Sequence, residues 1–224
     1  MRISTCFFSA ALLLSSNLAW SAPAQKAKSQ PDGKSAGALS FHVTARFRYH
    51  DGEDGDAPED SLDAKVLAQG QKARMETKIG GRPLVMIFAP PFLYKVLPLS
   101  KSGTRYPLSD VSKNPGLAGF NPQPWLRDPA AIREALRKQG AKRAADSILN
   151  GVPVELWNAQ KFMGLSGQVK AWLRRADALP LRLEIQTKAL TATATWRDYQ
   201  RVRAVPGAQF SPPAGFRMRD GQAN

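Results

Sequence analysis

The sequence predicts a mainly β protein with one inserted helix, and three observations lead to this prediction. Apolar and polar residues alternate with the period of a half-buried strand over most of the chain. A glycine pair and a proline pair separate neighbouring alternating segments, as turns do. A single segment near residue 130 has helical spacing instead. At 224 residues and 43% hydrophobic content, the chain is long enough for one domain with a sizeable core.

The N-terminus has the parts of a secretory signal peptide. Arg2 precedes an apolar stretch that ends in small residues, and we expect cleavage after Ala24. An uncleaved membrane anchor is the alternative, although the apolar run is short for a bilayer span. Cys6 is the only cysteine, so removal of residues 1–24 leaves a cysteine-free chain with a net charge of +13. We therefore expect an exported protein without disulfides, periplasmic in a Gram-negative host.

Residues 25–37 are polar and small, with Pro and Gly among them, which predicts a disordered linker. A single domain is expected over residues 38–218, with a short tail at 219–224. Its first strand has the clearest pattern, because apolar residues from Leu39 to Tyr49 occupy every second position. Six alternations in a row predict an antiparallel strand with one buried face.

Seven further segments have a strand pattern. Gly80-Gly81 predicts a hairpin turn after the first of them, and Pro90-Pro91 ends the second. Residues 84–89 are apolar at every position, as in a central strand that is covered on both faces. The segments are 73–79, 84–89, 92–96, 152–157, 169–174, 181–186 and 190–197.

Two segments between the strands predict loops. The acidic residues from Asp51 to Asp63 do not have the spacing of a calcium loop, so a solvated hairpin loop is favoured over a cation site. Residues 109–127 are rich in Pro, Gly and Asn and predict a long loop.

The spacing over residues 128–140 predicts the helix. Asp128 is placed to act as the N-cap, and Gly140 marks the end. Ile132, Ala135 and Leu136, continued by Gln139, form a narrow apolar stripe, and we expect Ile132 and Leu136 to face the sheet. Because the helix follows a long loop and lies between two groups of strands, it predicts either a lid over one sheet face or a plug at one end of the core.

Catalytic groups are scarce in this chain. Its two histidines, His42 and His50, fall on the polar side of the first strand, and no nucleophile elbow, P-loop or dinucleotide fingerprint occurs. One cysteine excludes a multi-cysteine zinc or iron–sulfur site. We therefore expect a protein that is not an enzyme and that uses no cofactor and no metal.

The positive charge is spread over the polar faces of separate strands rather than clustered. Such a surface suits the anionic headgroups of a membrane, while a purely solubilising charge is the alternative. A nucleic-acid partner is not expected, because no stacking-aromatic motif accompanies the charges.

Five motifs follow one another in a characteristic order. They are KARMETKIGGRPLVMIFAPPFLYKVLP at 72–98, NGVPVELW at 150–157, GQVKAW at 167–172, ALPLRLE at 178–184 and FSPPAGF at 210–216. In this order they resemble the LolA/LolB-like superfamily of periplasmic outer-membrane lipoprotein-sorting and lipoprotein-carrier proteins, over about residues 38–218. The chain departs from the family in two respects. The strand arginine that latches the carrier's lid has no unique counterpart, and no lipidated cysteine is present.

The resemblance implies a curved antiparallel sheet that forms an incomplete β-barrel with one or more lid or plug helices, and an apolar interior that holds acyl chains. We therefore predict a non-enzymatic periplasmic protein that carries or senses a lipid, a lipoprotein or another acylated ligand. The alternative is an envelope structural or interaction protein with a filled core and a basic partner-binding face.

Acyl chains are the expected partners, together with an anionic membrane surface or an envelope protein complex. The predicted ligand-binding residues are Phe41, Phe47, Met75, Ile87, Phe92, Val96, Ile132, Leu136, Leu156, Leu183 and Trp196.

Overall fold

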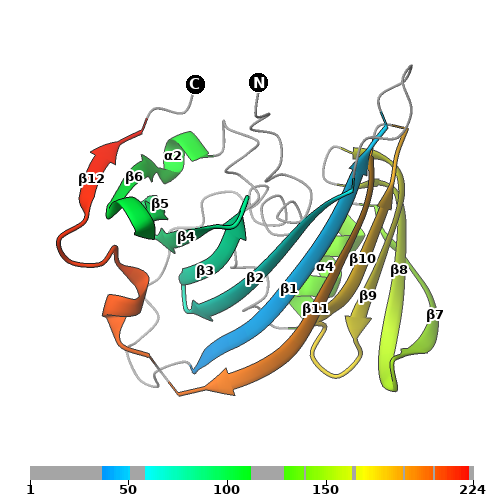
Figure 1. Cartoon of the computed structure of the whole chain (residues 1–224). Coiled ribbons are helices and arrows are strands. Elements are labelled where there is room, and N and C mark those ends of the chain that lie inside the picture. Colours follow the sequence, from blue (N-terminus) through cyan, green and yellow to red (C-terminus); the bar gives the residue numbers. More distant parts are fainter. Residues whose placement is uncertain are drawn as a thin grey trace. The chain divides into compact units, whose positions relative to one another are not determined.

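A computed structural model describes residues 37–50, 59–111, 129–138, 140–162, 165–188, 190–203 and 205–221. The expected signal peptide, most of the linker, the first part of the acidic segment and most of the long loop lie outside these residues. Strands make up most of what is described (Figure 1).

The strands lie where the alternation predicted them, with four additions. In chain order they are β1 Ala38–Tyr49, β2 Asp60–Gln69, β3 Lys72–Ile79, β4 Arg82–Ala89, β5 Phe92–Leu97, β6 Ser102–Pro107, β7 Lys142–Leu149, β8 Val152–Phe162, β9 Leu165–Arg174, β10 Pro180–Gln186, β11 Leu190–Val202 and β12 Arg217–Asp220. The helices are α2 Leu108–Val111 and α4 Pro129–Lys138, and short 3-10 turns are formed by η2 Pro98–Ser100 and η4 Gly207–Phe210.

All twelve strands belong to one hydrogen-bonded sheet in the order β12-β6-β5-β4-β3-β2-β1-β11-β10-β9-β8-β7. The pairs from β3 to β6 and from β7 to β11 are antiparallel, whereas β12 joins β6 in parallel. The two end strands pair with one neighbour each, so the sheet is not closed. The predicted fold class, a mainly β chain with an open, curved antiparallel sheet and few helices, is confirmed.

The chain divides into two compact units. Unit 1 draws on Met1–Phe41, Lys65–Leu126 and Tyr199–Asn224, and unit 2 on His42–Ala64 and Arg127–Asp198. Each unit is described separately below.

In unit 1, both faces of β4 are buried, as its continuous apolar sequence predicted. On one face Met86 lies opposite Met75 of β3. On the other face Val85 and Ile87 form a buried cluster with Val96 of β5 and Phe210 of η4. The segment after β11 therefore covers one face of this part of the sheet.

In unit 2, one face of the sheet is apolar, and the other carries mostly polar residues together with Val154, Leu156 and Trp172. The cross-strand pairs Trp157–Ala171, Ala171–Leu183 and Leu183–Ala194 run across β8, β9, β10 and β11. Directly opposed residues of neighbouring strands share a face, so these pairs define the apolar side. All of them are buried.

Two predicted turn signals have the expected geometry. Gly80 and Gly81 link β3 to β4 with φ of +54° and +76°, a conformation that glycine adopts without steric cost. At the end of α4, the Gly140 amide donates to the Arg137 carbonyl at 2.9 Å and the Ala141 amide to the Leu136 carbonyl at 3.0 Å. With φ of +82° at Gly140, this is a Schellman motif, so the predicted end of the helix is confirmed.

The loop predictions need correction. Asp60 and Asp63 lie in β2 and not in a hairpin loop, since Leu62, Ala64, Val66 and Ala68 of this strand are buried in alternation. The start of the predicted long loop, from Ser109, forms part of α2. Strand β12 also includes two residues that were assigned to the tail, because its backbone pairs with β6.

The other unpredicted strands carry a weak apolar signal. None of the residues of the edge strand β7 is buried, and most of them are exposed. In β6 the only buried residue is Gly103. Strands that bury few side chains lack the period of two on which their prediction depends.

Candidate functional site

The predicted ligand-binding residues are divided between the two units. Unit 1 holds Phe41, Met75, Ile87, Phe92 and Val96, and unit 2 holds Phe47, Ile132, Leu136, Leu156, Leu183 and Trp196. Most are buried, while Phe92 and Leu156 are half-buried.

Within unit 1, the predicted residues do not share one face. Met75 pairs with Met86, whereas Ile87 lies on the opposite side of β4. Ile87 and Val96 pack with Phe210, so their side chains are occupied by the core of unit 1. Phe92 lies against Tyr94 with ring centroids 6.0 Å apart, and the Arg105 guanidinium is 5.2 Å from its centroid. The Phe41 ring is 5.3 Å from that of Tyr199.

Within unit 2, Leu183 and Trp196 lie on the apolar face. Leu183 is paired with Ala194 across the strands, and Trp196 follows Ala194 by two positions in β11, so both side chains lie on the same side of the sheet as Ala194. Leu156 lies on the other face, since its partner is Trp172 and its neighbour Trp157 is the residue on the apolar side. Phe47 is buried and borders a cavity of about 390 Å³ that Arg46, Arg48, His50 and Arg182 also line.

Helix α4 lies against the apolar face of unit 2. Its stripe residues Ile132 and Leu136 are only 3% and 4% exposed. Two arginines of the same helix contact residues of β8 on that face. The Arg137 guanidinium is 5.6 Å from the centroid of the Trp157 ring, in cation–π geometry.

The second arginine forms a buried ion pair. Arg133 donates from Nε to Oε1 and Oε2 of Glu155, at 3.1 and 3.0 Å. Its Nη2 lies 2.9 Å from Glu155 Oε1. Arg133 also donates to the Arg175 carbonyl at 2.8 Å. Trp157 Nε1 donates to Glu155 Oε2 at 3.3 Å. A glutamate that is 4% exposed is tolerated here because these hydrogen-bond donors satisfy its carboxylate.

We name Arg133, Glu155, Trp157 and Arg137 the α4 anchor. The sequence patterns do not predict a role for these four residues. Two features of the sequence could have indicated the contact. Glu155 is a single acidic residue within the apolar strand segment NGVPVELW, and Arg133 and Arg137 directly follow the two large apolar residues of the helix. Alternation alone cannot show that Glu155 and Trp157 share the buried face of the strand. Because charged residues are rarely buried, the pattern favours placing both on the solvent-exposed face.

The anchor determines how the helix is attached. Ile132 and Leu136 are the only large apolar residues in the sequence of α4, so we infer that its charged pair contributes to the attachment. A hydrogen-bonded ion pair can exchange its partners for water, whereas a wide apolar stripe cannot.

The two histidines lie on the polar face, as the alternation predicted. His42 Nδ1 is 3.0 Å from Asp198 Oδ2, and His50 Nε2 is 2.8 Å from Thr191 Oγ1. Among the described residues, no three histidine, cysteine or acidic side chains are grouped as metal ligands would be. No helix in the described ranges has the length and apolar character needed to cross a membrane.

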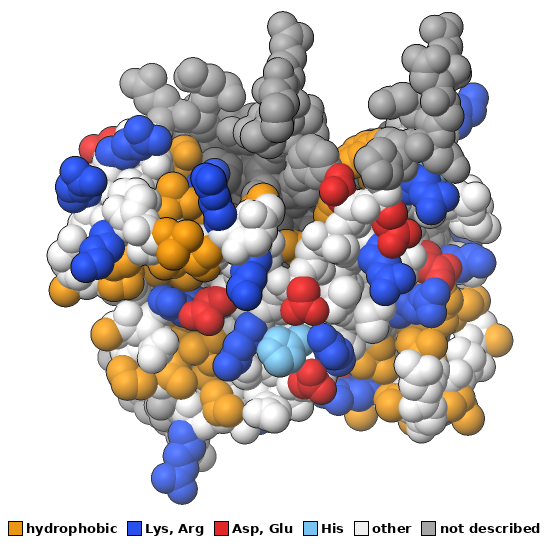
Figure 2. All heavy atoms as spheres, in the orientation of Figure 1, with side chains coloured by type: hydrophobic (Ala, Val, Ile, Leu, Met, Phe, Trp, Pro, Cys, Tyr) orange, Lys and Arg blue, Asp and Glu red, His pale blue; other side chains and the backbone are white. Residues whose placement is uncertain are grey.

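The polar strand faces carry mixed charge rather than a uniformly basic surface. Figure 2 shows Lys and Arg interspersed with Asp and Glu on the face in view. Five arginines predicted to form a basic face each have an acidic neighbour. The pairs are Arg46–Glu59 at 3.9 Å, Arg74–Glu76 at 2.7 Å, Arg174–Asp177 at 2.6 Å, Arg182–Glu184 at 2.6 Å and Arg197–Asp63 at 3.3 Å.

No protein-family model matches the sequence, and no curated protein matches it either. Solved structures do match. An uncharacterised conserved protein from Thermus thermophilus has a TM-score of 0.55 and 12% identity, with 83% of this chain and 91% of that chain covered.

Two further matches have lower structural similarity. A LolA superfamily protein from Nitrosomonas europaea has a TM-score of 0.33 and 12% identity over 77% of this chain and 90% of that chain. The lipoprotein LppX from Mycobacterium tuberculosis has a TM-score of 0.42 and 11% identity over 71% and 85%. At such identities the likeness concerns the fold. The likeness to the Thermus thermophilus protein is therefore one of fold, an antiparallel sheet with few helices.

Proposed function

We propose that this chain is a non-enzymatic binding protein of the cell envelope that carries or senses an acylated hydrophobic ligand. The ligand would be a lipid, a lipoprotein or a similar molecule, and its acyl chain would lie against the apolar face of unit 2. The N-terminal leader supports an exported, periplasmic location, because residues 1–24 have the composition of a cleavable signal peptide.

One observation carries the proposal: α4 is held over an apolar strand face by a buried ion pair and by Ile132 and Leu136, which are buried and are the only large apolar residues in its sequence. A helix that served only to complete a core would be expected to bury a wider apolar stripe. The narrow stripe limits the apolar area that the helix exposes when it moves away. An acyl chain that enters beneath it would then replace Ile132 and Leu136 as the cover of the sheet face.

The test is retention of a fluorescent fatty acid by the mature protein. Replacement of Ile132 and Leu136 by Asp puts two charges against an apolar surface, which is unfavourable and should hold the helix open. We expect retention to fall sharply, while the β signal in circular dichroism persists. Ile148→Asp in the same unit is the control, because Ile148 is 73% exposed.

The result also distinguishes the alternative function. If the double variant binds the fatty acid as the wild type does, α4 is not a lid. If it unfolds, α4 belongs to the core and the chain is better described as an envelope interaction protein. The deep burial of Trp157 on the apolar face of unit 2, at 1% exposure, is the observation that favours a filled core.

A further inference from the structure

Two hairpin turns lie at the same end of the sheet in unit 1. Strands β3, β4, β5 and β6 form an antiparallel meander, so the β3–β4 turn and the β5–β6 turn share one end. The turn η2, which leads from β5 toward β6, is in contact with β4. The Arg217 amide donates to the Lys101 carbonyl at 3.0 Å, which brings the start of β12 to the same place.

This end of unit 1 exposes large apolar side chains. Ile79 is 44% exposed, Leu97 42% and Leu99 75%. Within the described ranges only one other large hydrophobic side chain is classed as exposed, Ile148 in unit 2. Apolar groups gathered at turn tips mark an interaction site, since scattered single residues would need no explanation.

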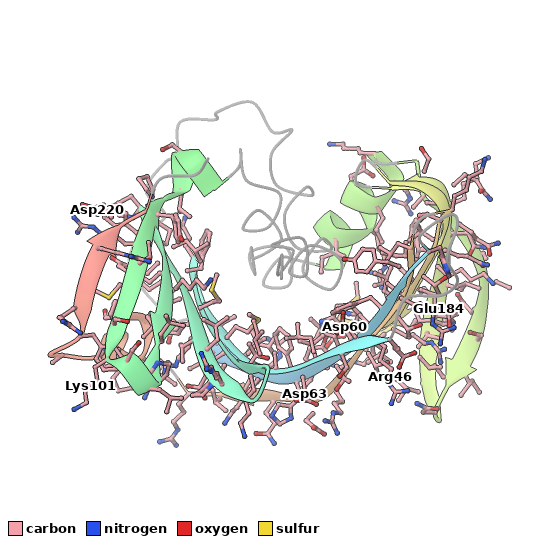
Figure 3. All side chains as sticks on the ribbon, turned by 45° about the horizontal axis from the view of Figure 1, so that its top comes forward. Arg46, Asp60, Asp63, Lys101, Glu184 and Asp220 are labelled. Atoms are coloured by element: carbon pink, nitrogen blue, oxygen red, sulfur yellow. The ribbon has the colours of Figure 1, made fainter. Side chains whose placement is uncertain are left out.

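The same end is basic and has no acid close by in sequence. From Thr77 to Ser109 the chain contains no Asp or Glu, but it contains Lys78, Arg82, Lys95, Lys101 and Arg105. Arg105 is paired with Asp220, which lies at the other end of β12 from Arg217. Figure 3 shows Lys101 at its turn and Asp220 well apart from it.

The charges of this end differ from those on the strand faces. Five strand-face arginines are paired with acids, as described above. For Lys78, Arg82, Lys95 and Lys101, no salt bridge occurs within the part of the chain that the structure describes. These lysine and arginine charges thus remain available to an anionic partner.

A groove of about 410 Å³ lies beside the β5–β6 turn, between residues of β5, β6 and β12. Its lining residues are Leu97, Ser102, Gly103, Thr104, Arg217, Met218 and Arg219. Arg219 Nε donates to Thr104 Oγ1 at 3.3 Å, which holds this guanidinium at the groove. No carboxylate is among the lining residues. Two guanidinium groups with hydroxyls beside them are the donors that a phosphate prefers.

We propose that this end of unit 1 docks on a membrane of anionic phospholipid. The phosphate headgroup would bind Arg217 and Arg219 in the groove. Leu97, Leu99 and Ile79 would enter the boundary between headgroups and acyl chains, surrounded by lysine and arginine. The proposal supplies the membrane contact that an envelope carrier needs, yet it rests on unit 1 alone. The fatty-acid test of α4 in unit 2 and the vesicle test of this docking site can therefore fail independently of each other.

Cosedimentation with vesicles tests this docking site. We expect binding to vesicles of phosphatidylcholine mixed with phosphatidylglycerol, weaker binding at high salt, and little binding to phosphatidylcholine alone. Arg217→Gln with Arg219→Gln should weaken binding about 30-fold, from the usual contribution of two cations at an anionic surface. Leu99→Ser should weaken it about tenfold, because one leucine no longer partitions into lipid.

Matched controls separate this site from the overall charge of the protein. Arg201→Gln with Arg203→Gln removes the same charge from two exposed arginines outside the groove. Ile148→Ser removes an equally exposed apolar residue from unit 2. Both controls should bind vesicles like the wild type. The proposal is overturned if the control pair weakens binding as much as the groove pair, or if neutral vesicles bind equally well.

Discussion

Substitution of Glu155 by Gln should release α4 from the sheet while unit 2 stays folded. The Glu155 side chain is 6% exposed and that of Arg133 is 23% exposed. Removal of one partner from a buried ion pair costs about 3–5 kcal/mol. Gln retains an acceptor for Arg133, and the partial exposure of Arg133 allows it to reach water. We therefore expect a smaller cost, about 2 kcal/mol.

Native-state hydrogen exchange measures this cost locally. A change of about 2 kcal/mol corresponds to about a 30-fold larger opening equilibrium. Amides of residues 133–138, which are placed to donate within α4, should exchange faster by that factor, while amides of β9 and β10 should change much less. The matched control is Glu134→Gln on the same helix. Glu134 is 52% exposed and lies 3.6 Å from Arg137, so its pair should contribute less than about 1 kcal/mol.

Two results would refute this reasoning. Equal protection in Glu155→Gln and Glu134→Gln would show that the buried pair does not hold the helix. A uniform loss of protection across β8, β9, β10 and α4 would show that the helix opens only when unit 2 unfolds.

Three further predictions concern the leader, the buried tryptophan and the C-terminal strand. Mass analysis of the exported protein should find a mature start at Gln25; a protein that retains Met1 in the membrane fraction would contradict this. Trp157→Ala should destabilise unit 2 by about 3–5 kcal/mol in chemical denaturation, because Trp157 is 1% exposed and the substitution leaves a cavity; a change below about 1 kcal/mol would contradict its place in the core. The hydrogen bond from Arg105 lowers the pKa of Asp220, so the pair stabilises β12 above the ordinary aspartate pKa and loses this contribution as pH falls through the lowered value. Hydrogen exchange of the Arg217–Asp220 amides should therefore become faster in acid. Asp220→Asn should abolish this pH dependence of the protection of β12, and a variant that keeps the wild-type acid profile would contradict the role of the pair.

The sequence was sufficient for most of the strands that bury one face or two, with β2 as the exception. Alternation located β1, β3 and β5, and the uninterrupted apolar run of β4 predicted its burial on both sides. It could not identify β7 or β12, because an edge strand is stabilised by backbone hydrogen bonds that place little demand on side chains. It also missed β2, whose acidic first residues resemble a loop although its later residues alternate.

The site was harder to predict than the fold. Ile132 and Leu136 were identified from helical spacing, and the structure buries both. The Arg133–Glu155 pair joins residues 22 positions apart, and no periodic pattern reports such a contact. Ile87 and Val96 were predicted to line a ligand site, but the turn η4 packs on them through Phe210. A strand's apolar face has the same pattern whether chain or ligand covers it.

Native mass spectrometry of the protein expressed with its own leader and purified from the cell envelope tests the central claim most directly. Wild-type protein should carry a co-purified acyl species that dissociates on activation. The variant with Asp at positions 132 and 136 should be recovered folded and without it. A wild-type protein that is folded, homogeneous and free of any acyl species, even after incubation with lipid extract, would contradict the proposed function.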